Sequence, residues 1–239
     1  MTPPDPMAPF AAAMEATWPA LAIHRAGPWA VRQGAGGGKR VSAASAVGDW
    51  HPDDIAVAEA AQAGLGQDKL FVIWPLDRAL DAALDAQFYA KIEPVVAYTA
   101  PVASFAPPLR MTSFPHWPPL QIAKEIWADG GIFGGRLAVM DRVSGPKTVV
   151  LGRTADRPSG AAFVALHGTT AMVHSVEVRE SQRCKGAGRQ LLAAAALWGA
   201  EQGADRLALA VTKANTGARA LYASLGMQPV GEYHYRLKV

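Results

Sequence analysis

Cysteine is almost absent from this chain, because Cys184 is the only one among 239 residues. An intramolecular disulfide is therefore excluded, and so is any metal site that needs several cysteines. We expect no metal. Charged residues are also sparse, at 18%, and the net charge is only +3. The basic residues are scattered except near residues 179–189, whereas a nucleic-acid-binding domain carries a broad basic face. We therefore expect no nucleic-acid partner.

Long hydrophobic runs are missing as well. No stretch approaches the roughly 18 apolar residues that a membrane helix needs. The segment Met1–Pro6 has no basic region and no apolar core, so it does not resemble a signal peptide. We expect a cytoplasmic protein without a membrane partner, present as a monomer or a homodimer. Half of the residues are hydrophobic, which is typical of a globular chain.

The hydrophobic pattern predicts alternating strands and helices along the whole chain. Expected helices cover residues 51–63, 77–87, 120–128, 135–143, 186–202 and 216–225, and residues 1–13 form a loose arm or a short helix. Expected strands cover residues 27–33, 40–47, 69–74, 94–100, 147–153, 161–166, 170–178, 206–211 and 230–237. The glycine run at 34–38 is either a phosphate cradle or a flexible hairpin turn. The strand expected after it favours the turn.

A proline-rich segment divides the chain. Residues 104–118 contain few regular signals and are interpreted as a linker between a first domain, 1–103, and a second domain, 119–239. A weak internal repeat supports this division. Residues 69–100 and 206–237 both show a strand, helix and strand pattern, and each copy has Pro-Val near its end and a tyrosine four residues after the proline.

The most informative stretch is Val176–Leu192, which is predicted to form a strand, a basic glycine-bearing turn and the start of a helix. Its pattern Arg183-x-x-Gly186-x-Gly188 places free backbone N–H groups at a helix N-terminus, where an anion binds favourably. Four cations surround the turn, namely Arg179, Arg183, Lys185 and Arg189. This combination suits a pyrophosphate.

Other interpretations of the turn fit less well. A dinucleotide-binding fingerprint needs a third glycine near position 191, which is a leucine here. A Walker A loop needs Gly-Lys-Ser/Thr, and this sequence is absent. The remaining alternative is a strand-to-helix turn whose basic character has no function.

The turn and a second segment together resemble the GNAT superfamily of N-acetyltransferases. The family pattern is an apolar strand that ends in Val, then Arg or Gln five residues later, then x-x-Gly-x-Gly. Val178, Arg183, Gly186 and Gly188 match it. The later segment 215–227, from Asn215 through Tyr222 to Gly226-Met227, is similar to the family's Asn…Ala-x-x-x-Tyr-x-x-x-Gly-Phe. Cys184 and Glu180 depart from the pattern, because Gly and Pro are common there.

The resemblance implies a mixed α/β (α+β) fold with two GNAT-like domains, each a mostly antiparallel sheet flanked by helices. The first is a degenerate relative and the second is catalytic. The implied reaction transfers acetyl from acetyl-CoA to a primary amine by direct transfer, and the acceptor is a small molecule or a peptide. The residues implied to bind the cosubstrate are Val176, Val178, Arg183, Cys184, Lys185, Gly186, Ala187, Gly188, Arg189 and Asn215. Asn215 would otherwise simply cap its helix.

Three residues are catalytic candidates. The resemblance assigns Tyr222 as the acid for the leaving thiolate, and the alternative is a tyrosine that fills the core. His174 stands four residues before Val178, where aralkylamine-type relatives carry a catalytic histidine, and it can otherwise satisfy a neighbour. Strand alternation predicts that residues 172, 174, 176 and 178 share one face and that Glu177, the other possible base, points to the opposite face.

The acceptor is not specified by any residue pattern in the sequence. GNAT proteins acetylate small amines, antibiotics, amino acids and proteins, and no motif here selects among them. Two alternative functions stay open at this point. One is a transferase that uses another acyl-CoA, and the other is a non-catalytic regulatory protein that binds CoA.

Overall fold

A computed structural model of the chain describes residues 7–239 and contains one sheet of eight strands and one of three. The large sheet has the order β4-β11-β5-β10-β9-β8-β7-β6, and the small sheet has the order β1-β2-β3. The large sheet consists of β4 (Leu70–Ile73), β5 (Tyr89–Pro101), β6 (Ser113–His116), β7 (Lys147–Thr154), β8 (Arg157–His167), β9 (Thr170–Val178), β10 (Arg206–Thr212) and β11 (Gln228–Lys238). The small sheet consists of β1 (Ala22–Ala26), β2 (Trp29–Gln33) and β3 (Ser45–Ala46). The mixed α/β fold confirms the expected class.

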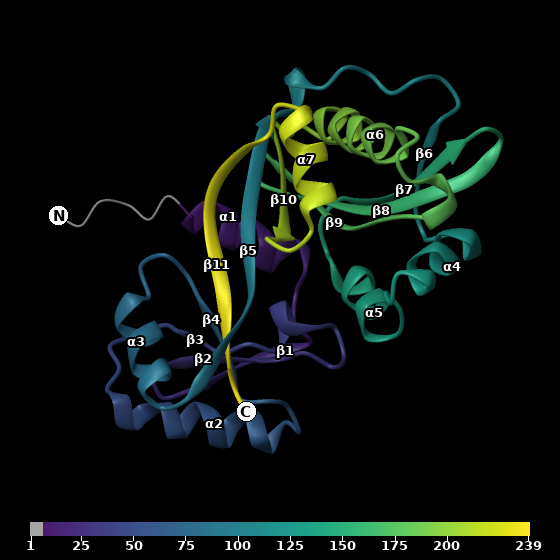
Figure 1. The fold of residues 1–239 in the computed structure, drawn as a ribbon. Helices are drawn as coiled ribbons and strands as arrows, with labels where there is room; N and C mark the ends of the chain where they lie inside the picture. The colour runs from purple at the N-terminus through teal and green to yellow at the C-terminus, as the bar shows by residue number, and fades with distance from the viewer. Residues whose placement is uncertain (1–6) are drawn as a thin grey trace.

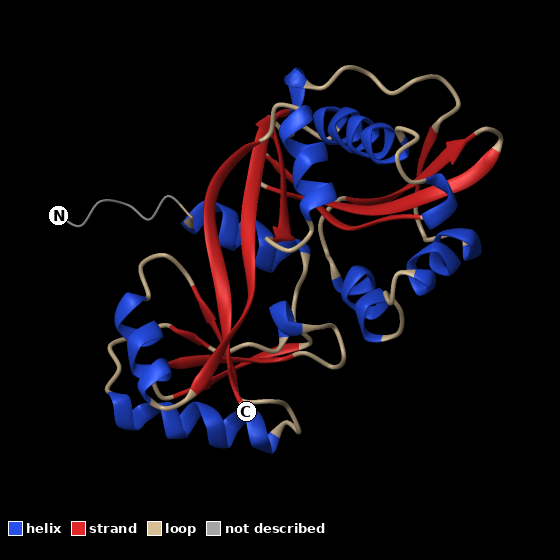
Figure 2. Ribbon diagram, viewed as in Figure 1, coloured by secondary structure: helices blue, strands red, loops and turns tan. Residues whose placement is uncertain are grey.

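Seven α-helices flank these sheets within residues 7–239 (Figures 1 and 2). They are α1 (Ala8–Thr17), α2 (Ile55–Gly64), α3 (Arg78–Ala86), α4 (Gln121–Asp129), α5 (Gly135–Arg142), α6 (Ala187–Glu201) and α7 (Thr216–Ser224). Short 3₁₀ helices lie at η1 (Lys39–Val41), η2 (Pro52–Asp54), η3 (Val102–Ser104) and η4 (Glu180–Gln182). Every helix expected beyond residue 50 is present, because each has an amphipathic pattern that the fold buries on one side.

The large sheet crosses the predicted boundary between the two halves. Strand β5, from the first half, lies between β10 and β11 of the second half and pairs antiparallel with both. In Figure 1, β5 and β11 run as long strands from the part that holds α2 and α3 to the part that holds α6 and α7. The division into 1–103 and 119–239 stays a prediction, and the large sheet is shared by the two halves, whereas the small sheet lies wholly within the first half.

The second half is layered. Helix α6 packs on one face of β7, β8 and β9, and the core there joins Leu191 and Leu192 to Val164 and Val173. Helix α4 covers the opposite face, where Trp127 and Ile126 meet Phe163. The N-terminal helix α1 also contacts β8 and β9. A helix of the first half is therefore part of the wall of the second.

The first half has its own apolar core between α2, α3 and the small sheet. The rings of Trp29, Phe71 and Tyr89 pack edge to face, with centroids 5.3 and 5.7 Å apart. The strand expected at 40–47 is wrong, because residues 39–41 form the 3₁₀ helix η1 and only Ser45–Ala46 pair with β2. Strand β1 was not expected at all.

The glycine run at 34–38 is not a hairpin turn, since β2 returns to β3 only after η1. It packs against the start of α5 instead. A Cβ on Gly37 would lie 2.7 Å from Val41 and would also clash with Val139, and a Cβ on Gly135 would clash with the backbone of Gly36. The glycines allow the two halves to approach closely.

The proline-rich segment is more regular than expected. Residues Ser113–His116 form β6, which pairs antiparallel with β7 and closes one edge of the large sheet. The two copies of the internal repeat do form β4–α3–β5 and β10–α7–β11. They are neighbours in the sheet, because β11 lies between β4 and β5.

Candidate functional site

The site is built around two parallel strands that separate. Strands β9 and β10 pair from Thr170↔Arg206 to Val173↔Leu209. Beyond these positions β9 continues to Val178 and β10 to Thr212 without pairing with each other. The backbone groups of β9 that face this opening are therefore available for another chain-like partner.

A β-bulge interrupts β9 at the opening. Phe163 on β8 pairs with His174, and Ala161 pairs with Glu177, so one residue of β8 stands opposite two residues of β9. Ser175 has φ +52° and is one of the two. Its carbonyl oxygen accepts a hydrogen bond of 2.8 Å from the indole N–H of Trp127. This bond and the left-handed backbone fix the bulge.

The bulge makes the predicted strand alternation wrong. His174 and Glu177 share one face, whereas Val176 and Val178 pack with the α6 core on the other face. The predicted grouping of His174 with Val176 and Val178 fails because the extra residue reverses the alternation beyond it.

The N-terminus of α6 offers the backbone donors that the sequence predicted. Gly186, its N-cap, has φ +81°, and no side chain caps the helix. Among residues 7–239, the N–H groups of Ala187, Gly188 and Arg189 have no backbone acceptor. A Cβ on Gly188 would lie 2.8 Å from Cδ2 of Leu221, so this glycine permits the close approach of α6 and α7. The structure therefore explains why both positions of the motif are glycine: Gly186 has a positive φ, and Gly188 leaves room for Leu221.

The loop before α6 carries exposed cations. Arg183 donates from Nε to the carbonyl oxygen of Val178 at 3.1 Å, and its Nη2 lies 3.3 Å from Oε1 of Glu177. Lys185 donates to the carbonyl oxygen of Ser181 at 2.8 Å, and Arg189 donates to Oγ of Ser224 at 2.9 Å. Cys184 is exposed and has φ +58°, which is the backbone region that favours glycine. This conformation explains why a glycine is common at its position in the family pattern.

A cavity of about 620 Å³ lies between this turn and α7, and we call it the α6–α7 cavity. Its lining contains most of the predicted site, namely Val176, Glu177, Val178, Arg183, Cys184, Gly186, Ala187, Gly188, Arg189, Asn215 and Tyr222. The lining also includes Gln182, Gly217, Ala218 and Leu221, which the sequence did not single out. Two predicted residues, His174 and Lys185, are outside the lining. The structure thus brings together the second motif and the glycine turn, which are separated in sequence.

Tyr222 and Asn215 both come from α7. Only 5% of Tyr222 is exposed, and its ring lies 5.8 Å from that of Tyr98. Burial raises the pKa of Tyr222 to about 12, so the phenol stays protonated near neutral pH. Asn215 caps α7, because its Oδ1 accepts a 3.0 Å hydrogen bond from the N–H of Ala218. It lines the cavity at the same time.

His174 lies away from that cavity, at the junction of the two halves. Only 2% of it is exposed, and its ring packs 5.0 Å from Trp18. Its Nε2 is 2.8 Å from Oγ1 of Thr17, which in turn donates to the carbonyl oxygen of Ala13 at 2.6 Å. Because the Thr17 hydroxyl proton is used for Ala13, His174 donates from Nε2 and its Nδ1 is an acceptor. That Nδ1 is 3.2 Å from Nη1 of Arg40.

The environment keeps His174 neutral. Burial, and then the nearby charge of Arg40, hold the pKa of His174 well below its usual range. Both ring nitrogens are engaged. Glu177, the other base candidate, is among the residues that line the α6–α7 cavity. Its side chain is 20% exposed, is paired with Arg183 and lies beside Gly130 at the end of α4.

A second cavity, of about 230 Å³, opens on the other side of the β9 bulge, and we call it the central cavity. Ser175 lines it, while the next residue, Val176, lines the α6–α7 cavity. Arg40 from η1 and Arg136 from α5 also line it. Sequence reasoning missed both arginines, because neither belongs to a motif and their proximity arises only from the packing of the two halves.

Residues 118–227 match the model of the acetyltransferase (GNAT) family. This region is a GNAT-family acetyltransferase. The separating strands, the bulge and the α6 turn lie within it. The family resemblance drawn from the two motifs is confirmed, and the protein is accordingly an acyl-CoA-dependent N-acyltransferase. Within residues 7–239, no helix is long and apolar enough to cross a membrane.

Two relatives resemble the chain over nearly its whole length, and a third resembles most of it. The uncharacterized N-acetyltransferase YobR of Bacillus subtilis is 27% identical over 234 residues, which cover 93% of this chain and 95% of YobR. A GCN5-related N-acetyltransferase from Kribbella flavida has a similar fold, with a TM-score of 0.72 at 17% identity over 96% of this chain and 94% of that one. A tandem GNAT protein from the clavulanic acid biosynthesis pathway has a TM-score of 0.55 at 15% identity, with 78% and 68% covered.

Proposed function

We propose that the protein transfers the acetyl group of acetyl-CoA to a primary amine by direct transfer. The observation that carries the proposal is the α6–α7 cavity, in which unpaired backbone N–H groups, cationic side chains and a protonated tyrosine face one space. The N–H groups of 187–189 and the positive end of the α6 dipole suit a pyrophosphate. Arg183 and Arg189 add charge beside them.

The fit extends from the turn to the opening of the sheet. The unpaired part of β9 supplies backbone donors and acceptors to an amide-rich arm, as an added strand would use them. Acetyl-CoA, when bound, supplies the activated thioester carbonyl. Tyr222 lines the same cavity and can donate its phenolic proton to the departing sulfur.

The proposed acetyl transfer needs Tyr222 as its only acid. The amine nitrogen forms the new C–N bond as the C–S bond breaks, the sulfur takes the proton of Tyr222, and the proton lost by the amine returns to the phenolate through water. Glu177 is the remaining candidate for an intermediate proton acceptor, since it lines the cavity. His174 as the base, also a prediction from the resemblance, has less support because both of its nitrogens are already hydrogen-bonded.

We also propose that the chain is of the tandem type, with a degenerate first domain at 1–103, a connecting segment at 104–118 and a catalytic domain at 119–239. The β4–α3–β5 and β10–α7–β11 units support this, and so does the likeness to a tandem GNAT protein. The first half contributes Arg40 and Trp18 to the central cavity, so its role is to shape the acceptor side.

The test is a pair of measurements on the whole chain. Titration calorimetry with acetyl-CoA is expected to give a dissociation constant in the micromolar range, about −8 kcal/mol. A thiol-release assay with a panel of amines is expected to show acceptor-dependent formation of CoA. Absence of binding would contradict the donor assignment. Binding without release of CoA for any amine would favour the non-catalytic CoA-binding alternative, and binding of longer acyl-CoA with faster turnover would favour another acyl donor.

A further inference from the structure

Two arginines from different halves of the chain line the central cavity without a carboxylate partner. Arg40 comes from η1 and Arg136 from the first turn of α5. The only carboxylate in the lining, Glu93, is paired with Lys39 at 2.6 Å. Within residues 7–239, neither Arg40 nor Arg136 has a carboxylate oxygen within 4.0 Å. The cavity therefore carries two guanidinium groups that have no carboxylate within ion-pair distance among the described residues.

The guanidinium of Arg40 is held in place by a neutral partner. It donates to Nδ1 of His174 at 3.2 Å, and His174 is itself fixed through Thr17 to the backbone of α1. Since the imidazole carries no charge, it orients Arg40 without neutralising it. Arg136 is loosely held, with Nη1 3.5 Å from the carbonyl oxygen of Gly131, and its Nε lies near Gly38. A guanidinium that is oriented and has no direct ion-pair partner is suited to bind an anion.

We propose that the acceptor is an amine that also carries a carboxylate, and that Arg40 and Arg136 bind this carboxylate in the central cavity. The inference rests on the proposed acetyltransferase function and names the class of acceptor for it. The bound carboxylate then lies in the cavity that Ser175 lines, and the next residue, Val176, lines the α6–α7 cavity. Binding of the carboxylate therefore places the amine of the acceptor near the opening between β9 and β10. Polyamines and other polycationic acceptors are excluded by repulsion from the same two charges.

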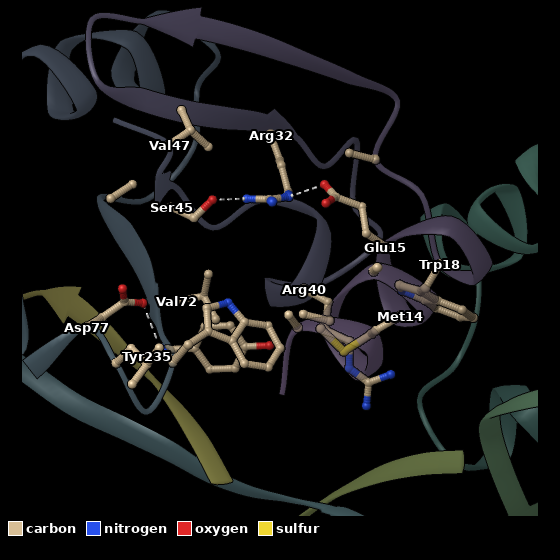
Figure 3. A pocket seen from close by; sticks show the side chains of 17 residues that line it. Met14, Glu15, Trp18, Arg32, Arg40, Ser45, Val47, Val72, Asp77 and Tyr235 are labelled. Atoms are coloured by element: carbon tan, nitrogen blue, oxygen red, sulfur yellow. Dashed lines mark hydrogen bonds and ion pairs between the residues drawn. The ribbon is translucent and has the colours of Figure 1, made fainter. Parts of the chain in front are cut away.

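A neighbouring cavity has room for the rest of such an acceptor. It has a volume of about 400 Å³ and shares Trp18, Arg40 and Tyr235 with the central cavity (Figure 3). Val72, Trp74 and Met14 make much of its lining apolar. Its other guanidinium, on Arg32, is already neutralised by Glu15 at 2.9 Å, and Figure 3 shows this pair on the opposite side of the cavity from the Arg40 guanidinium. A carboxylate is therefore drawn to Arg40, and an apolar side chain fits the space beside it.

The experiment compares matched acceptors on the full chain with acetyl-CoA as donor. L-Phenylalanine, L-leucine and glycine are each assayed against their amides and against the corresponding amines without the carboxyl group. An aminoalkylphosphonate of each type distinguishes a carboxylate from a phosphorus oxyanion. The variants are Arg40→Met, Arg40→Lys and Arg136→Met, and Arg157→Met, an exposed arginine outside the cavities, is the control. Calorimetry with acetyl-CoA shows whether each variant remains folded and binds the donor.

We expect kcat/KM for at least one free amino acid to exceed that of its amide by about 10- to 100-fold, mainly through KM. Arg40→Met is expected to remove this preference by raising KM for the free amino acid, and Arg40→Lys should restore part of it. Arg136→Met is expected to weaken the preference, and Arg157→Met should leave it unchanged.

Other outcomes overturn the inference. Equal or faster turnover of the neutral amines, a preference for the phosphonate, or a carboxylate preference that survives both arginine substitutions would each contradict it. Turnover of neutral amines alone leaves the acetyltransferase function intact and removes only the acceptor class. Release of CoA from no acceptor at all contradicts the proposed function itself.

Discussion

Nη1 of Arg40 lies 3.2 Å from Nδ1 of His174, although the two residues are 134 positions apart in the chain. The contact joins η1 of the first half to β9 of the second, directly beside the bulge at Ser175. Because Thr17 on α1 holds the other ring nitrogen, three separate segments meet at one imidazole. This histidine is thus a positioning residue for Arg40, and its neutrality is a condition for the arrangement.

The first prediction concerns the dependence of stability on pH. The pKa of His174 in the folded protein is far below that of the unfolded chain, so the unfolded chain binds an extra proton as the pH falls below about 6.5. The free energy of unfolding of the wild type therefore decreases as the pH falls, because the unfolded chain binds a proton at His174. The His174→Asn variant has no imidazole at this position and lacks this contribution. Between pH 7.5 and 5.5, the stability advantage of the wild type over His174→Asn should shrink by about 1 kcal/mol. Urea unfolding at both pH values measures it, with the exposed His51→Asn as control.

An unchanged difference between the wild type and His174→Asn at the two pH values would contradict a neutral buried imidazole. The same reasoning predicts that the pH profile of kcat/KM contains no ionisation of His174 near neutrality. Loss of the carboxylate preference in His174→Asn, with neutral amines still turned over, would identify a positioning role that a merely structural histidine does not have.

The second prediction concerns Tyr222. Replacing it with phenylalanine should lower kcat by about 100-fold, since general acid catalysis typically contributes 10² to 10⁴. Acetyl-CoA binding should be nearly unchanged, because the ring stays in place against Tyr98. With its pKa raised to about 12, Tyr222 stays protonated across the ordinary assay range. Steady-state kinetics and calorimetry check this, and Tyr98→Phe is the matched control. A Tyr222→Phe enzyme with full kcat would remove the residue from the mechanism.

The third prediction concerns the contact between α6 and α7. Gly188→Ala places a Cβ 2.8 Å from Cδ2 of Leu221, so the leucine or the helix must move. We expect a loss of about 1–3 kcal/mol in stability and at least tenfold weaker acetyl-CoA binding. Gly217→Ala is the control, because it lines the same cavity and its Cβ would meet nothing within 4 Å. Equal donor affinity in both variants would contradict a role for this approach.

The fourth prediction concerns the junction of the two halves. A Cβ on Gly135 would clash with the backbone of Gly36, which cannot yield as a side chain can. Gly135→Ala should therefore cost about 2–3 kcal/mol of stability and raise KM for the acceptor, because it separates α5, with Arg136, from the segment that carries Arg40. Thermal unfolding and acceptor kinetics measure the two effects. Gly64→Ala, whose Cβ would meet nothing within 4 Å, should change neither.

The helices and strands of the second half were largely predictable, because each has a clear period and a stop signal. The glycine turn of the candidate donor site was also predictable, because Arg183, Gly186 and Gly188 form a pattern within one short segment. The backbone of Cys184 has φ +58°, in the left-handed region that favours glycine, which is the residue common at this position of the family pattern.

The acceptor side could not be predicted in the same way. The bulge at Ser175 depends on the register of β8 against β9, and periodicity within one strand does not contain that register. Arg40 was expected on a strand, and its 3₁₀ turn is set by the packing of the glycine run on α5. Strand β6 was hidden in a proline-rich segment, because an edge strand needs only part of its N–H groups for pairing.

Strand β11 pairs with both β4 and β5, and this has a consequence for synthesis of the chain. When β4 and β5 emerge from the ribosome, the strand that belongs between them does not yet exist. Their facing backbone groups stay exposed until residues 228–238 have been made, which is a delay that leaves two unpaired edges open to wrong partners. The nascent first half therefore depends on its own distal segment, or on a chaperone, to protect those edges.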